Sequence, residues 1–243
     1  MILRRFIKHV TEQNWFAVGL DVLVVITGIF LGMQVTDWNE ERKERQEENS
    51  YLQRLLVDMD RSLELQKHEV EVSSGQLDRI KYVIRVIEGD PNTSIKEFDK
   101  NLVQGGVTRS MRLVKGTMNE LVSTGRLATI SNQSIRNAVI ELIENFERGE
   151  KTIERVNVRF EPFKVEYHRY FIDRSYNPLN KIPVDYDLEK LKKDETFLLI
   201  SHNVYQMMLI YNRFHTLSYE RTLTFRNHLA TTLNIPVLKE SEE

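Results

Sequence analysis

Residues 15–38 have the sequence Trp15-Phe-Ala-Val-Gly-Leu-Asp-Val-Leu-Val-Val-Ile-Thr-Gly-Ile-Phe-Leu-Gly-Met-Gln-Val-Thr-Asp-Trp38, and from Trp15 to Val35 only three residues are polar and none is basic. An apolar run of about 20 residues is what a helix needs to cross a hydrocarbon core of about 30 Å. Tryptophan rings favour the two interfaces of a bilayer, so Trp15 and Trp38 are expected to anchor the ends of the run. The run therefore predicts one transmembrane helix over residues 15–37.

Two other interpretations of this run fit less well. A secretory signal peptide has a shorter apolar region followed by a cleavage site of small residues, and residues 33–38 contain no such site. A core helix of a soluble protein is usually shorter and amphipathic, whereas this run is apolar almost all round. We expect it to stay in the chain as an uncleaved signal anchor.

The charges on either side of the run bear on its orientation. Residues 1–14 carry Arg4, Arg5 and Lys8 between apolar residues at helical spacing, which predicts a basic amphipathic segment on the membrane surface. Positive charge before a first span favours a cytoplasmic N-terminus, although residues 42–45 are also largely basic. We expect a single-pass protein of the inner (cytoplasmic) membrane, with its N-terminus cytoplasmic and the rest of the chain extracytoplasmic.

One face of the predicted span carries a polar residue and two glycines. Asp21, Gly28 and Gly32 fall close to one helical line, and a G-x-x-x-G spacing lets helix backbones approach closely in lipid. A carboxyl within the membrane is expected to face protein or water rather than lipid. These three residues form a predicted transmembrane interface with another copy or with a partner membrane protein. The other interpretation is that the glycine spacing is accidental and that Asp21 extends towards the nearer interface.

Composition limits the remaining possibilities. Of 243 residues 29% are charged and 41% hydrophobic, with 10 glycines and 5 prolines, a balance typical of a helical, well-solvated protein. The net charge of −2 argues against nucleic-acid binding, which needs a concentrated basic face. The absence of cysteine excludes disulfides and thiolate catalysis.

The polar part of the chain is predicted to be all-α, an elongated antiparallel bundle that continues from the transmembrane helix. Residues 38–50 are charged helix formers and predict a solvated stalk. Residues 51–236 carry apolar residues at close to 3.5-residue spacing and predict a helical, coiled-coil-like bundle with a small insert around 91–131. Residues 237–243 form an acidic tail.

Local signals predict where the bundle helices begin and end. Ser73-Ser74-Gly75 predicts a turn between two helices. Capping-box spacings predict helix starts at Ser94-Ile-Lys-Glu97 and Thr117-Met-Asn-Glu120. Pro162 should kink its helix rather than end it, and Asp194 should cap the last long helix. The predicted inner line of that last helix is Phe197, Ile200, Val204, Met207, Tyr211, Phe214, Leu217, Arg221, Phe225 and Leu229.

Two stretches resemble a known family. Asp21-Val-Leu-Val-Val-Ile-Thr-Gly28, with Gln34 and Trp38-Asn-Glu-Glu-Arg-Lys43, resembles the N-terminal signature of an uncharacterised bacterial single-span membrane protein family, the domain of unknown function number 6090. Residues 117–132 resemble its second shared patch. The chain departs from the family at Leu20 and Gly32, where members usually have glycine and a larger residue. The resemblance implies an anchor and a helical fold, and it implies no reaction.

The sequence contains no recognised catalytic, metal or cofactor motif. No histidine follows a glutamate by three residues, as a di-iron bundle would need, and no nucleotide-binding or hydrolase signature is present. The aromatic line Phe160, Phe163, Tyr167, Tyr170 and Phe171 could form a ligand pocket or, more simply, part of a core.

Three functions remain open. The leading prediction is a membrane-anchored, non-catalytic interaction or scaffold protein that self-associates through its transmembrane helix and uses no cofactor. The second is an extracytoplasmic ligand-sensing or accessory subunit of a larger membrane complex. The third is an enzyme with an unrecognised site.

Overall fold

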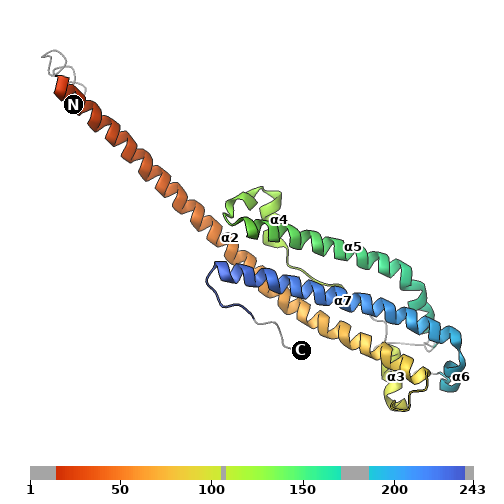
Figure 1. Cartoon of the computed structure of the whole chain (residues 1–243). Coiled ribbons are helices and arrows are strands. Elements are labelled where there is room, and N and C mark those ends of the chain that lie inside the picture. The colour runs from red at the N-terminus through yellow and green to blue at the C-terminus, as the bar shows by residue number, and fades with distance from the viewer. Residues whose placement is uncertain (1–14, 105–107, 171–185, 239–243) are drawn as a thin grey trace, which may run out of the picture. The chain divides into compact units, whose positions relative to one another are not determined.

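The computed structural model describes residues 15–104, 108–170 and 186–238, and within them every regular element is a helix (Figure 1). The elements are α2 (Trp15–Ile87), α3 (Ile95–Gln104), α4 (Gly116–Ser123), the 3-10 turn η1 (Arg126–Thr129), α5 (Gln133–Arg169), α6 (Leu188–Lys193) and α7 (Glu195–Thr232). The all-α prediction is confirmed. The basic segment 1–14 and most of the acidic tail 237–243 lie outside the described residues.

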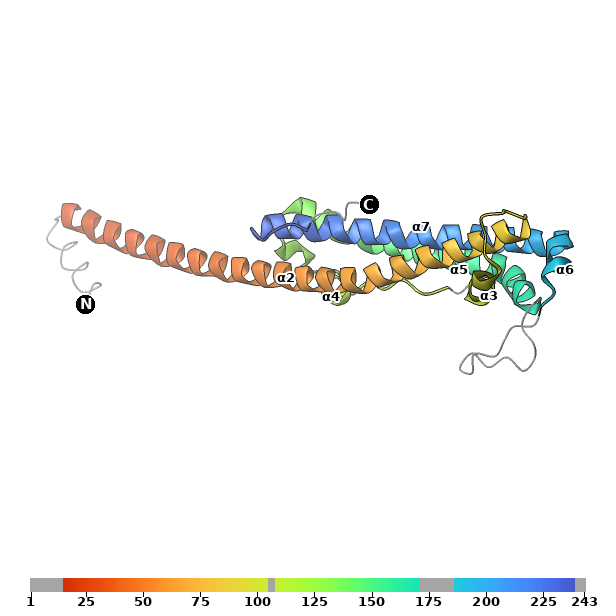
Figure 2. The same cartoon turned by 90° about the horizontal axis from the view of Figure 1, so that it is seen from below.

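The chain divides into two compact units, Met1–Tyr51 and Leu52–Glu243. In the second unit α5, α7 and the part of α2 from Leu52 onward lie side by side in both views of the molecule (Figures 1 and 2). Contacts between Asp60 and Arg226 and between Ser73 and Asn212 run in opposite sequence directions, so α2 and α7 are antiparallel. This is the predicted bundle architecture.

An apolar core fills the end of this bundle that α3 and α6 close. We call it the apolar core; its buried members are Ile80, Val83, Val86, Ile87, Phe98, Leu102, Phe160, Tyr167, Leu191, Phe197, Ile200, Val204, Met207, Met208 and Tyr211. The rings of Tyr167 and Phe197 are stacked with centroids 5.7 Å apart. The Tyr167 hydroxyl donates to Leu102 O at 3.2 Å, so its one polar atom is satisfied inside the core.

The predicted turn at Ser73-Ser74-Gly75 is wrong, because α2 continues through it to Ile87. A glycine inside a helix costs only about 1 kcal/mol relative to alanine, which the packing of the following turns offsets. Ser73 satisfies its hydroxyl within the bundle, donating to Val70 O at 3.0 Å and lying 3.0 Å from Asn212 Oδ1. The helix ends where Gly89 adopts a φ of 81°, as expected of a glycine cap.

Helix starts and the proline were predicted with mixed success. Asp194 Oδ1 accepts from the N–H groups of Thr196 at 2.9 Å and Phe197 at 3.1 Å, which confirms the predicted cap of α7. α5 continues past Pro162 to Arg169, and its ribbon bends in its last turns (Figure 1). The capping box predicted from Thr117 to Glu120 is wrong: α4 begins at Gly116 and has no side-chain cap from its own N-terminal residue.

The predicted inner line of α7 is correct up to Tyr211 and again at Phe225 and Leu229, and it is wrong between them. Phe214 is half-buried, whereas Leu217 and Arg221 are exposed. The buried positions between Tyr211 and Phe225 are instead His215, Ser218, Thr222 and Leu223. Phe214 leaves the inner line because it lies against Gly149 of α5, where an added Cβ would stand 2.1 Å from the ring.

Candidate functional site

The predicted transmembrane helix is largely exposed in the described part of the structure. One helix among the described residues, Val18–Ile87, is long and apolar enough to cross a membrane; its most apolar 18-residue window has a mean hydropathy of 2.1 and none of it is buried. A core helix of a soluble protein would be mostly covered by its own chain. By its length and composition this segment could therefore span a membrane.

The predicted interface residues Asp21, Gly28 and Gly32 all lie on the one helix α2. No atom of the described residues would come within 4 Å of a Cβ added at Gly28 or Gly32, and Gly32 O accepts from the Thr36 hydroxyl at 3.1 Å. Asp21 is half-buried. Trp38 is 64% exposed, and the side chain of Trp15 lies outside the described part of the structure. The proposed pairing of this face with another helix stays a prediction.

The second unit contains a feature that sequence analysis missed, a buried polar layer next to the apolar core. We use this term for five residues of α2 and three of α7: Ser62, Gln66, Glu69, Ser73, Gln76, His215, Ser218 and Thr222, all of them buried. In α2 these five positions continue a strict 3–4 spacing that includes Leu55 and Met59 before them and Ile80 and Val83 after them. The same helix face is thus apolar, then polar, then apolar again.

An extended segment explains much of this polarity. Residues 108–115, which we call the strap, have no regular structure and run beside α2. Gln66 Nε2 donates to Arg112 O at 2.8 Å, and Val114 N–H donates to Ser62 Oγ at 2.9 Å. An extended strand outside a sheet leaves its peptide groups without partners, so the helix beside it must supply polar side chains. Apolar residues at positions 62 and 66 could not do this.

Glu69 and His215 are the ionisable groups of the layer. Glu69 Oε1 lies 3.8 Å from the Arg112 guanidinium of the strap, and His215 Nδ1 lies 3.2 Å from the carbonyl oxygen of Glu69. Burial lowers the pKa of His215 below its usual value, although the Glu69 carbonyl and carboxylate oppose this shift. The imidazole is therefore neutral at neutral pH, and in the tautomer that carries its proton on Nδ1 it donates to the Glu69 carbonyl.

Three buried atoms of the layer have no hydrogen-bond partner among the described residues: Gln66 Oε1, Glu69 Oε2 and His215 Nε2. A buried polar atom without a partner costs about 1–3 kcal/mol. Such atoms are uncommon in folded proteins, and each one calls for an explanation. The polar layer is thus a part of the bundle interior in which buried polar atoms are available for further hydrogen bonds.

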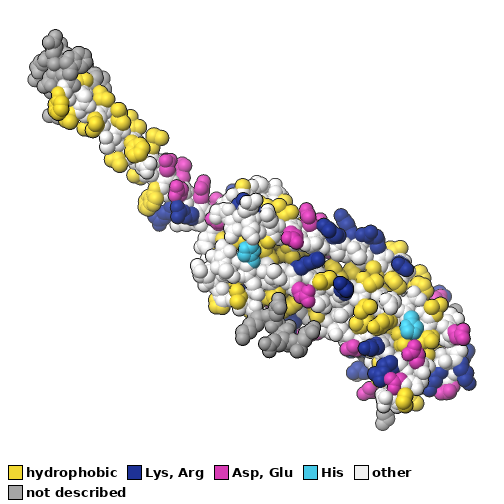
Figure 3. All heavy atoms as spheres, viewed as in Figure 1, with side chains coloured by type: hydrophobic (Ala, Val, Ile, Leu, Met, Phe, Trp, Pro, Cys, Tyr) yellow, Lys and Arg dark blue, Asp and Glu magenta, His cyan; other side chains and the backbone are white. Residues whose placement is uncertain are grey.

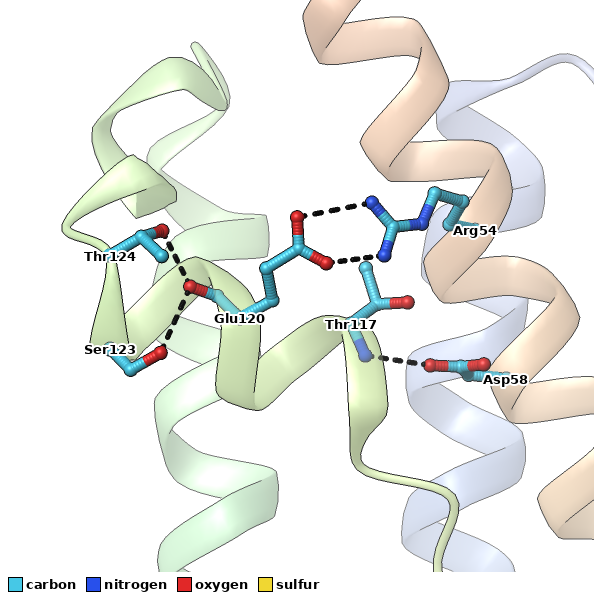
Figure 4. A network of polar contacts seen from close by, with 6 residues as sticks. All are labelled: Arg54, Asp58, Thr117, Glu120, Ser123 and Thr124. Carbon is cyan, nitrogen blue, oxygen red and sulfur yellow. Dashed lines mark hydrogen bonds and ion pairs between the residues drawn. The ribbon is translucent and has the colours of Figure 1, made fainter.

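A second polar contact, drawn in Figure 4, joins the lobe formed by α4 and η1 to α2. Asp58 Oδ2 accepts from Thr117 N–H at 3.0 Å, so a carboxylate from another helix caps the N-terminus of α4. Glu120 forms a two-point ion pair with Arg54 instead of reaching back to its own helix start (Figure 4). The two residues of the predicted capping box therefore serve as docking contacts.

The remaining candidates from the sequence belong to the core or to the surface. The aromatic line packs inside the bundle, since Phe160 and Tyr167 are buried and Phe163 and Tyr170 pack against the apolar core; Phe171 lies outside the described residues. In the described part of the chain, no cluster of three His, Cys, Asp or Glu side chains could hold a metal ion.

The sequence does contain a signal for the polar layer, namely a helical spacing that continues through polar residues. The spacing of Leu52, Leu55 and Met59 continues without interruption through positions 62, 66, 69, 73 and 76 to Ile80. Extending that repeat would have placed five polar residues inside the bundle. A search for apolar periodicity stops at the first of them.

Comparison of the chain with family models, with curated proteins and with solved structures gave no match. The resemblance to the bacterial single-span family therefore stays a prediction that rests on its two quoted stretches. What the molecule does has to be inferred from its own geometry.

Proposed function

We propose that the chain is a membrane-anchored, non-catalytic interaction or scaffold protein that associates with itself through its transmembrane helix. The observation that carries this proposal is the wholly exposed apolar window of α2. A bilayer supplies the environment these side chains lack, and transfer of so many apolar residues into lipid anchors a chain effectively irreversibly. The role of such a protein is to hold its bundle at a membrane.

Self-association is the second part of the proposal. Asp21, Gly28 and Gly32 share one line of a helix, and no described residue packs over Gly28 or Gly32. Interhelical contacts in lipid favour small residues, because they allow dispersion contacts between backbones. The Asp21 carboxyl on the same line would then meet a partner rather than hydrocarbon.

The experiment that tests self-association compares masses in detergent or in a two-hybrid assay of the isolated span in membranes. Gly28→Leu and Gly32→Leu should disrupt the oligomer, because a leucine forces the backbones apart. Asp21→Ala should weaken it less, since hydrogen bonds between membrane helices contribute on average well under about 2 kcal/mol.

Val22→Leu and Ile26→Leu are the matched controls, because both positions are exposed and lie off the glycine line. They should leave the oligomer unchanged. If every variant keeps the mass of the wild type, the glycine face is not an interface. The proposal that the protein self-associates through its transmembrane helix is then wrong.

The proposed orientation places the N-terminus in the cytoplasm and the bundle outside it, in the inner membrane of a bacterium. The basic residues that precede the span support this orientation. A reporter enzyme that is active only outside the cytoplasm, fused after Glu243, should be active. Activity of a cytoplasm-only reporter at the same position would invert the topology.

A second candidate function is an extracytoplasmic sensing or accessory subunit. The observation that favours it is the set of unpartnered buried atoms on Gln66, Glu69 and His215. A partner complex that moves the strap would change the pairing of these atoms. Co-purification from mild detergent, followed by identification of any membrane protein in fixed ratio, separates this candidate from the self-associating scaffold.

A further inference from the structure

An open groove of about 520 Å³ runs between α5 and α7, beside the apolar core. Its floor includes Val156 and Phe160 from α5 and Ile210 from α7. Arg155 and Arg159 line it on the α5 side. On the opposite side α7 contributes the amides of Asn203 and Gln206. The groove thus combines an apolar floor with one cationic wall and one amide wall.

The cationic wall continues along α5 beyond the groove. At 100° per residue, four basic residues fall within an arc of about 80° on this helix: Arg148, Lys151, Arg155 and Arg159. Figure 3 shows Lys and Arg side chains gathered along the edge of the bundle that α5 forms.

None of these four cations makes an ion pair with a carboxylate of the described residues. Two carboxylates of the same helix pair elsewhere, Glu150 with Lys115 and Glu161 with Lys164. Arg155 Nε donates only to the carbonyl of Lys151, and the Arg159 guanidinium lies 5.3 Å from the centroid of the Phe160 ring. The row therefore carries four cations without an ion pair among the described residues, on a protein whose net charge is −2.

The α7 side of the groove has the spacing of a helix-packing seam. Leu199, Asn203, Gln206 and Ile210 follow one another at intervals of four, three and four residues. Leu199 is 61% exposed at the end of this line. A seam at 3–4 spacing presents one continuous face to a neighbouring helix. Two parallel seams on either side of a groove are the setting in which a further helix packs onto a bundle.

We propose that the groove between α5 and α7 docks an acidic amphipathic helix of a partner protein. Acidic side chains at helical spacing would meet Arg155, Arg159 and the cations that precede them, over about 16 Å or three turns. Apolar side chains on the adjacent face would cover Leu199 and the floor at Val156 and Ile210. The amides of the α7 wall donate to the same carboxylates.

Other anionic occupants match the groove less well. A single phosphate would touch only one or two cations of a row of this length. Single-stranded nucleic acid needs exposed aromatic faces on which bases stack, and the groove's aromatic ring, Phe160, is only 6% exposed. An anionic lipid headgroup has no apolar surface that could cover the exposed Leu199.

The test uses the full chain in detergent and a displayed library of 18-residue helices. Each library member keeps leucine at one heptad seam and varies Glu, Gln and Lys at the flanking positions. Wild-type protein should enrich Glu at the flanking positions. The double variant Arg155→Glu/Arg159→Glu should reverse the preference to Lys and should bind the selected acidic helix about tenfold or more weakly.

The matched control is Lys67→Glu/Lys81→Glu, which makes the same change of charge at two exposed residues of α2. It should keep the wild-type preference, and circular dichroism should show equal helicity for all three proteins. A library without charge preference, or a preference that survives the arginine reversal, overturns the proposal.

Two further probes separate the other anions. Heparin and the water-soluble headgroup of an anionic phospholipid, glycerophosphoglycerol, should bind more weakly than the selected helix. Tighter, arginine-dependent binding of either one overturns the protein partner in favour of a polyanion or a membrane surface. The mass of the oligomer in detergent is measured separately, so the failure of this proposal and the failure of self-association are distinguishable.

Discussion

The apolar core and the polar layer are neighbouring parts of one bundle, built from the same helices and the same 3–4 spacing. In the apolar core α2 contributes Ile80 and Val83, which pack against the aromatic residues of α5 and α7. In the polar layer the equivalent positions are Gln66 and Glu69, which both contact the strap and each keep one buried oxygen without a hydrogen-bond partner among the described residues. The 3–4 spacing therefore determines which residues of α2 face inward. The segment that packs against them determines whether those residues are polar or apolar.

The difference also separates two contributions to the fold. Burial of apolar side chains supplies free energy without direction, whereas hydrogen bonds between buried groups favour one alignment of the helices. We infer that buried apolar side chains, in the apolar core and at the other end of the bundle, supply most of the stability, and that the polar layer fixes the register of α2 against α7 and the place of the strap. Mutations in the two regions should differ in size and in kind.

The largest effect is expected in the apolar core. Phe197→Ala removes a ring that is fully buried between Tyr167 and Tyr170, and it should lower the free energy of unfolding by about 3–5 kcal/mol. Denaturant titration followed by circular dichroism measures this loss. Leu199→Ala, two residues away and exposed, is the control and should change stability by less than about 0.5 kcal/mol. Equal losses would mean that this end of the bundle is not packed.

In the polar layer, Ser62→Ala should cost less but should act on the strap. It leaves Val114 N–H without its acceptor, at a cost of about 1–3 kcal/mol. Hydrogen exchange read by mass spectrometry should show faster exchange in the peptide that contains residues 108–115. Ser74→Ala, at an exposed position of the same helix, should leave that exchange unchanged. Unaltered protection in Ser62→Ala would remove the strap's dependence on α2.

The polar layer should also make stability depend on pH. The pKa of His215 is lowered by burial, so the unfolded chain binds a proton more readily than the folded one. The stability that depends on the neutral imidazole is present above the unfolded pKa, about 6.5, and is lost as pH falls below it. His168 is shifted in the same direction, so the informative quantity is the difference between wild type and His215→Gln. Parallel pH profiles for the two proteins would contradict the prediction.

The smallest effect is expected where polar contacts face solvent. Arg54 and Glu120 are both exposed, and such pairs contribute about 0–1 kcal/mol. A double-mutant cycle with Arg54→Ala and Glu120→Ala should give a coupling energy in that range, which falls as salt is added. A coupling above about 2 kcal/mol would show that the α4 lobe depends on this pair as much as the strap depends on Ser62.

Sequence reasoning found the elements whose signals are local. The apolar run of α2, the Asp194 cap and the Gly89 stop each depend on a few adjacent residues, and the structure has all three. The inward positions of the apolar core were also predictable, because Phe197, Val204 and Met207 are apolar and regularly spaced.

The errors lie where a residue's role is set by a segment distant in sequence. Gln66 and His215 are absent from the predicted inward-facing residues, since nothing near them in sequence indicates the strap. The start of α4 was assigned to Thr117 and Glu120, whereas Asp58, far away in the chain, supplies the cap. The turn at Gly75 was predicted from composition and was overridden by packing on both sides.

The unbroken 3–4 spacing of α2 also constrains how this bundle can change in evolution. Inserting or deleting one to three residues between Leu55 and Ile80 would rotate the next part of the helix away from its neighbours. Seven residues restore the seam, but they also shift Asp60 and Ser73 against Arg226 and Asn212, so α7 must change by the same length. Relatives of this protein should therefore lengthen or shorten these two helices together, in steps of two turns.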